Sequence, residues 1–128
     1  MDNRPTLKKT ERISYQREID RLFIQGSAFL SYPLRVVYLV QKPFSGATIS
    51  VLISVSKKKF KRAVKRNRMK RLIREAYRQK KAALVNHCQE KENGLLIAFL
   101  FIGNGLSPWK EIEVAMEKAL DILKEKMK

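Results

Sequence analysis

The side chains with the clearest capacity for chemistry are cations, and half of them fall in one short stretch. Residues 57–81 hold 14 of the 28 Lys and Arg residues and one acid, Glu75, and so carry +13 of the formal net charge of +16. Cations set against phosphates release condensed counterions, which gives affinity for nucleic acid without reading a base sequence. A charge run is usually only a solvated helix face, but such a face mixes both signs, and this one does not. The stretch therefore predicts contact with a nucleic acid.

Helical spacing sorts this stretch into two faces. At about 100° per residue, one face gathers the polar side chains Arg66, Asn67, Lys70, Arg71, Arg74 and Arg78. The opposite face gathers the apolar side chains Met69, Leu72, Ile73, Ala76 and Ala83. Guanidinium groups grip phosphate through two parallel hydrogen bonds, while an amide can donate to phosphate or accept from a ribose hydroxyl or a metal-bound water. We expect a helix whose apolar side packs on a sheet and whose arginine side faces a phosphate backbone.

The remaining side chains offer little for catalysis by the protein itself. The chain has one histidine, His87, and one cysteine, Cys88, and its acids are scattered along the expected first and last helices. This set provides no paired carboxylates, no zinc ligand set and no internal disulfide. We predict no catalytic residue, and we assign no role to His87, Cys88 or Tyr77.

Length and composition indicate one folded domain over residues 1–128. Hydrophobic residues make up 45% of the chain, too many for a disordered polycation. The longest apolar run, residues 95–102, is far shorter than the roughly 20 residues of a membrane-spanning helix. The apolar face of the basic helix is expected to be used in the core, which argues against a membrane-surface helix. With no apolar secretory segment at the start, we expect a cytoplasmic protein.

Periodicity predicts the elements before the basic stretch. Ser14 is suited to cap a first helix that carries Ile19, Leu22 and Phe23 at helical spacing and ends before Gly26. A short edge strand is expected over 27–30. Strand 34–40 is followed by turn residues at 42–46 and by an alternating strand over 49–55, which predicts a hairpin.

Three further elements are expected after it. One long helix should span 62–85, and the apolar run 95–102 is suited to the middle of a sheet. Ser107 and Pro108 fit the cap and first position of a last helix. Its core-facing stripe is Trp109, Ile112, Met116, Ala119, Leu123 and Met127.

The basic stretch also carries a specific motif. Residues 65–78, KRNRMKRLIREAYR, preceded by SVSKK at 54–58 and Ala63-Val64, closely resemble the signature of the bacterial ribonuclease P protein family. The likeness continues loosely through LKK at 7–9 and LFIQG at 22–26 and covers nearly the whole chain. Two departures stand out: Ile19 replaces an aromatic residue common in the family, and Lys59-Phe60-Lys61-Arg62 lacks the glycine often found before the helix.

The resemblance implies an α+β fold, a two-layer α-β sandwich with about four strands and three helices. It also implies a left-handed βαβ crossover through the arginine helix, where the general rule favours the right-handed form. Residues 57–81 become the basic turn and arginine-rich helix of one RNA-binding domain, and the polar residues 1–12 are expected to be disordered until RNA is present.

The implied function is that of the protein subunit of ribonuclease P, which binds the catalytic RNA and the 5′ leader of precursor tRNA and assists endonucleolytic removal of that leader. Catalysis belongs to the RNA subunit, which mainly holds the Mg²⁺, with Asn67 as an outer-sphere metal contact. The implied RNA contacts are Lys57, Lys58, Arg62, Arg66, Asn67, Arg68, Lys70, Arg71, Arg74 and Arg78. Replacing Arg66 and Arg71 by alanine should therefore lower the salt dependence of RNA binding.

The leader is expected in a cleft between the sheet and the first helix, contacted by Ile19, Phe23 and Tyr38. Unpaired bases stack on aromatic rings while nearby cations follow the backbone. Phe23 as core packing, and Tyr38 as an ordinary strand residue, are open alternatives.

Other functions remain open at this point. A structural or ribosomal RNA-binding protein would share the basic helix without a processing role. A DNA-binding module would carry more base-reading side chains among its cations, and a protein nuclease would need a carboxylate cluster. The oligomeric state of the free protein and its leader-sequence preference are also left open.

Overall fold

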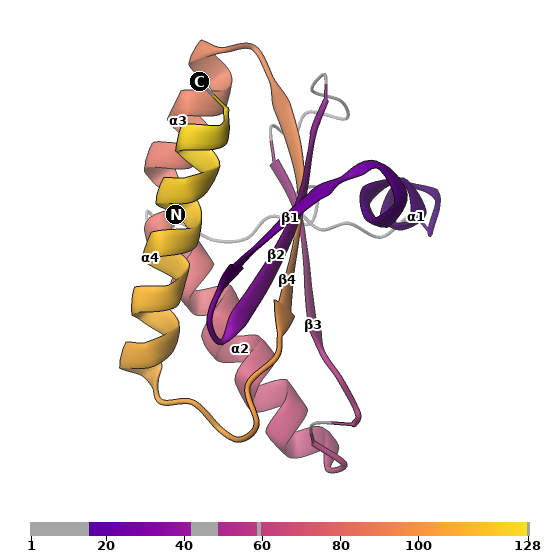
Figure 1. Ribbon diagram of the computed structural model, residues 1–128. Helices are drawn as coiled ribbons and strands as arrows, with labels where there is room; N and C mark the ends of the chain where they lie inside the picture. Colours follow the sequence, from indigo (N-terminus) through magenta and orange to yellow (C-terminus); the bar gives the residue numbers. More distant parts are fainter. Residues whose placement is uncertain (1–15, 42–48, 59, 128) are drawn as a thin grey trace, which may run out of the picture.

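The computed structural model describes residues 16–41, 49–58 and 60–127, with side chains of the first helix from Glu18 onward. Four strands form one sheet: β1 (Ser27–Ser31), β2 (Leu34–Gln41), β3 (Ile49–Val55) and β4 (Gly94–Phe101). The helices of this part of the chain are α1 (Gln16–Gln25), α2 (Ala63–Lys80), α3 (Ala82–Glu90) and α4 (Trp109–Lys126). Figure 1 shows α2, α3 and α4 on one side of the sheet and α1 on the other. The expected α+β class is confirmed.

The order of the strands is β1-β2-β4-β3, and it corrects one prediction. β2 and β3 were expected to form a hairpin, but β4 lies between them, antiparallel to β2 and parallel to β3. All eight residues of β4 are buried or nearly so, and a strand that is apolar on both faces is stabilised at the centre of a sheet. The hairpin of the sheet is instead β1–β2, joined at Tyr32-Pro33.

The two parallel strands are joined through α2 and α3, so the predicted crossover is present. The left-handed sense of that crossover stays an expectation from the resemblance.

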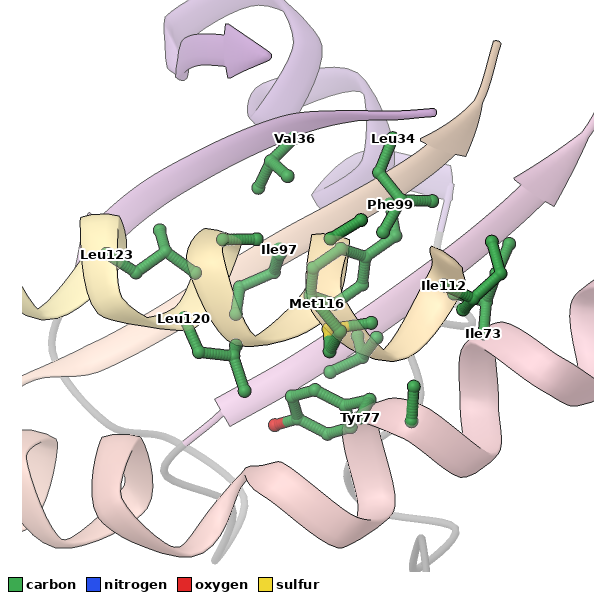
Figure 2. Packing of buried hydrophobic residues seen from close by; sticks show 14 of the residues in the cluster. Leu34, Val36, Ile73, Tyr77, Ile97, Phe99, Ile112, Met116, Leu120 and Leu123 are labelled. Atoms are coloured by element: carbon green, nitrogen blue, oxygen red, sulfur yellow. The ribbon is translucent and has the colours of Figure 1, made fainter. Parts of the chain in front are cut away.

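The main core lies between the sheet and the layer of α2, α3 and α4. Val36, Ile97 and Phe99 from the sheet meet Tyr77 of α2 and Met116 of α4, all fully buried (Figure 2). The stripe predicted for the last helix is confirmed, since five of its six members are buried and Trp109 packs against the same cluster.

The long helix expected over 62–85 is interrupted at Lys81, which gives four helices where three were expected. Figure 1 shows α3 alongside α4, whereas α2 runs obliquely across the sheet. The change of direction buries Leu84 and Cys88, and brings the Cys88 Sγ within 3.7 Å of the Met127 Sδ. Burial of these two side chains explains the interruption, because two helix segments can each aim an apolar face at the core.

Helix ends were predicted less accurately. Pro108 occupies the N-cap of α4, and no side-chain hydrogen bond caps the helix, so Ser107 is not its cap. α1 ends at Gln25 as expected, and the Gly26 N–H donates to the Leu22 carbonyl oxygen at 2.9 Å. A Cβ at residue 26 would lie 2.3 Å from that same oxygen, so only glycine fits. Ser14, the turn at 42–46 and residues 1–12 lie outside the described residues.

Candidate nucleic-acid interface

One side of α2 is fixed in the core. Met69, Ile73, Ala76 and Tyr77 are each fully buried, and the Tyr77 ring lies 5.7 Å from the Phe99 ring of β4 (Figure 2). Tyr77 was left without a role and is now an anchor of this helix. Because the anchored side faces the sheet and α4, the opposite side of α2 faces solvent.

Most of the predicted RNA contacts lie on the solvent side of α2 and on the turn before it, whereas Arg66 and Lys70 border the buried side, within about 20° of Tyr77 around the helix axis. The exposed members are Lys57, Lys58, Arg62, Asn67, Arg68, Arg71 and Arg74, and the half-buried ones are Arg66, Lys70 and Arg78. Long cationic side chains gathered on one helix and the turn before it are suited to contact a phosphate backbone. We call these ten residues the arginine face.

Two members of the arginine face are engaged within the protein. Arg78 forms an ion pair with Glu75, the acid of the basic stretch, and its Nε donates to Glu75 Oε2 at 2.9 Å. Arg66 Nη1 donates to the carbonyl oxygens of Phe60 and Lys61. Arg68, Arg71 and Arg74 are exposed, so the strongest phosphate contacts are expected from these three.

The basic turn before α2 is held by a residue that sequence reasoning did not single out. Phe60 is buried, and its ring stacks on the ring of Phe101 with the two ring centroids 5.9 Å apart. Within the turn the Lys58 N–H donates to the Ser56 Oγ at 3.1 Å. The sequence did hold a signal for this anchor, because Phe60 is an apolar residue with two cations on either side of it. The turn therefore keeps its cations outside while one side chain reaches the core.

The other face of the sheet carries α1. Leu22 is fully buried and packs with Val37, Leu96 and Ala98, and the half-buried Ile19 packs against the same cluster. Phe23 is 45% exposed, so much of its ring lies outside the core.

The structure does not bring Tyr38 together with Ile19 and Phe23. Tyr38 packs with the main core, on the side of the sheet that faces α2, α3 and α4. Its ring centroid lies 5.9 Å from that of Phe29. Side chains alternate along a strand, so its neighbour Val37 is the residue that faces α1. We therefore do not carry Tyr38 into the proposed leader site.

Part of the sheet beside α1 carries no helix from the described residues. One row of pairing partners crosses all four strands here: Leu30, Arg35, Leu100 and Ser54. Leu30 is 64% exposed and Arg35 is exposed as well. Figure 1 shows α1 over only one portion of this face. Arg35, a single cation inside the otherwise apolar run 34–40, was the signal that sequence reasoning passed over.

These surfaces do not fit a metal ion by themselves. Among the described residues, no three His, Cys, Asp or Glu side chains are placed to share a metal. Asn67 is exposed between cations and offers one amide oxygen, whereas Mg²⁺ needs six oxygen ligands, usually including carboxylates or phosphates. Within the same residues, no helix is long and apolar enough to cross a membrane.

A small α+β domain with an arginine-lined helix on one side of its sheet and, as far as the described residues go, a partly open sheet face on the other has the surface chemistry of a nucleic-acid-binding protein. The Ribonuclease P family model matches residues 7–123. The ribonuclease P protein components of two Porphyromonas gingivalis strains are 46% identical to this chain; the matches cover 89% and 94% of it and 83% and 89% of those proteins. The chain therefore belongs to the ribonuclease P protein family.

Solved structures agree with this assignment. The RNase P protein of Staphylococcus aureus superposes with a TM-score of 0.70 at 25% identity, covering 91% of this chain and 97% of that one. The RNase P protein of Thermotoga maritima shares the fold, with a TM-score of 0.63 and 22% identity over 90% of this chain and 96% of its own. The protein is thus a subunit of a ribonucleoprotein endoribonuclease that acts in tRNA 5′ processing, and its partner is the RNA of that enzyme.

Proposed function

We propose that the arginine face binds the catalytic RNA, and that the sheet face beside α1 holds the single-stranded 5′ leader of precursor tRNA. The observation that carries the proposal is the division of α2 into a fully buried side and a cationic side facing solvent. A rigid helix presents its guanidinium groups without first having to be ordered, which favours binding to a phosphate backbone.

Two RNAs can be held because the two surfaces lie on opposite sides of the sheet. α2 packs on one face and α1 on the other, as Figure 1 shows. With a net charge of +16, the protein also screens the repulsion between two RNA backbones brought close together. The protein therefore strengthens substrate binding and contributes no nucleophile.

The leader site combines a ring, apolar side chains and a cation. Phe23 offers a partly exposed ring for stacking, Leu30 and Leu100 provide apolar surface, and Arg35 can contact a phosphate. These are the elements by which proteins bind unpaired nucleotides. A product without a leader makes none of these contacts, so the site favours precursor over mature tRNA.

Magnesium is assigned to the RNA in this proposal. Because the residues of α2 do not fit the ion, Asn67 would at most bond to a water molecule of an ion that RNA phosphates hold.

A processing assay tests the function as a whole. Precursor tRNA is incubated with ribonuclease P RNA at low magnesium, with and without the protein, and the mature 5′ end is quantified. We expect cleavage to depend on the protein under these conditions. A structural RNA-binding protein without a processing role would bind RNA and leave cleavage unchanged, and that result would reject the proposal.

Leader binding has a matched pair of variants on α1. Phe23→Ala removes the partly exposed ring, whereas Ile24→Ala removes a neighbouring side chain that is 81% exposed. Stacking of one base contributes about 1–3 kcal/mol, so Phe23→Ala should weaken precursor binding about tenfold and leave mature tRNA binding unchanged. Equal effects of the two substitutions, or an equal loss for mature tRNA, would place the leader elsewhere.

A further inference from the structure

Arg66 is turned back toward the segment that precedes its own helix. Its Nη1 donates to the carbonyl oxygen of Phe60 at 2.8 Å and to that of Lys61 at 2.9 Å. It is half-buried, whereas Arg68 and Arg71 on the same helix are exposed. One donor nitrogen of Arg66 is therefore engaged by the basic turn.

Among the residues of the turn that the structure describes, few other hydrogen bonds hold it. Arg62 is the N-cap of α2 and makes no side-chain cap hydrogen bond. The Phe60 backbone N–H donates to the Ser56 carbonyl oxygen over a long 3.3 Å. The Arg66 backbone N–H donates to the Arg62 carbonyl oxygen at the same distance. Helix starts normally have a side chain that accepts hydrogen bonds from the free backbone N–H groups, and α2 has none at Arg62. The Arg66 guanidinium holds the opposite kind of group, because it donates to the carbonyl oxygens of the turn.

Charge repulsion acts against the compact form of the turn. Lys57, Lys58, Lys61 and Arg62 carry like charges within a few residues of one another. Phe60 fixes the middle of the turn through its ring contact with Phe101. The Arg66 hydrogen bonds fix the part between that anchor and the start of α2.

We propose that Arg66 is a positioning residue: it holds the basic turn in one shape before RNA arrives, so that Lys57, Lys58, Lys61 and Arg62 meet the RNA already ordered. This rests on the proposed function, in which the turn binds RNA, and it departs from the expectation that Arg66 itself grips a phosphate. A turn ordered in advance loses less conformational entropy on binding.

The test compares Arg66→Ala and Arg66→Lys with Arg68→Ala as the control. Arg68 is exposed and carries the same charge two residues away. Lysine keeps the charge of residue 66 but lacks the planar guanidinium that spans both carbonyl oxygens. The first readout is amide hydrogen exchange of the free protein at Lys58 and Phe60, with the melting temperature measured in parallel.

We expect both Arg66 variants to accelerate exchange at these two amides, while Arg68→Ala leaves it at the wild-type rate. In binding to ribonuclease P RNA, both Arg66 variants should lose about tenfold in affinity and keep the wild-type salt slope. Arg68→Ala should instead lower the magnitude of the slope by about one unit. A residue with a merely structural role would lower the melting temperature and leave the affinity of the folded protein unchanged.

Three further outcomes would also overturn the positioning role. Unchanged exchange in Arg66→Ala would show that the turn needs no such support. Wild-type affinity in Arg66→Lys, together with a smaller slope in Arg66→Ala, would make Arg66 an ordinary phosphate contact. If Arg68→Ala and both Arg66 variants all bind like wild type, RNA binding by this surface fails, and the positioning role fails with it even if exchange is faster.

Discussion

Cys88 is buried where α3 meets the end of α4, with its Sγ 3.7 Å from the Met127 Sδ. Burial raises the pKa of the Cys88 thiol from 9.0 to about 11, because the charged thiolate loses its hydration there. The thiol therefore stays protonated at neutral pH and belongs to the core rather than to any reactive site.

This pKa predicts a loss of stability in alkali. The unfolded chain releases the thiol proton near pH 9, but the folded protein keeps it until about pH 11. The contribution is complete below pH 9 and is lost as the pH rises through this window, by at most about 3 kcal/mol. Urea unfolding of wild type and Cys88→Ala at several pH values checks it: the gap in unfolding free energy should shrink from pH 8 to pH 11. A constant gap would contradict the buried thiol.

Single residues also show where sequence reasoning reached its limit. Helical spacing predicted the exposed positions of Asn67, Arg71 and Arg74, because one anchored side determines the other. It could not predict that Arg66 turns back to the basic turn, since a long side chain chooses its partner from the tertiary structure. Tyr38 was placed on the wrong sheet face because aromatic character was weighed above strand alternation.

At the scale of elements, α2 both anchors the fold and displays the arginine face. Replacing Tyr77 by alanine removes a fully buried ring that contacts Phe99, and should lower the free energy of unfolding by about 3–5 kcal/mol. Arg71→Ala, on the exposed side of the same helix, should change it by less than about 0.5 kcal/mol. Denaturant unfolding of both variants measures this. A similar cost for both would mean that the two sides of α2 are not divided as described.

Most elements could be predicted from periodicity, but their arrangement could not. The strands predicted over 34–40, 49–55 and 95–102 are present in the structure, and their ends differ from the predicted ends by about one residue at most. Periodicity reports which face of a strand is buried and says nothing of which strand lies beside it, so β2 and β3 were paired wrongly. The break at Lys81 was missed for a similar reason, because the direction of α3 depends on its contact with α4.

At the scale of the whole molecule, the distribution of charge matters more than its total. α4 carries four lysines as well, but its five acids outweigh them and give the helix a net charge of −1. The double variants Arg71→Ala/Arg74→Ala on α2 and Lys118→Ala/Lys126→Ala on α4 therefore make a matched pair. Each removes two exposed cations and lowers the net charge equally, and only the first touches the arginine face.

The central claim is that this one face binds the catalytic RNA, and the salt dependence of binding tests it most directly. Affinity for ribonuclease P RNA is measured for wild type and both double variants over a range of salt concentrations. Loss of two phosphate contacts should reduce the magnitude of the slope of log affinity against log salt by about 1.5 for the α2 pair. The α4 pair should keep the wild-type slope. Equal slopes for both pairs would contradict a localised interface and leave only a general attraction between a basic protein and RNA.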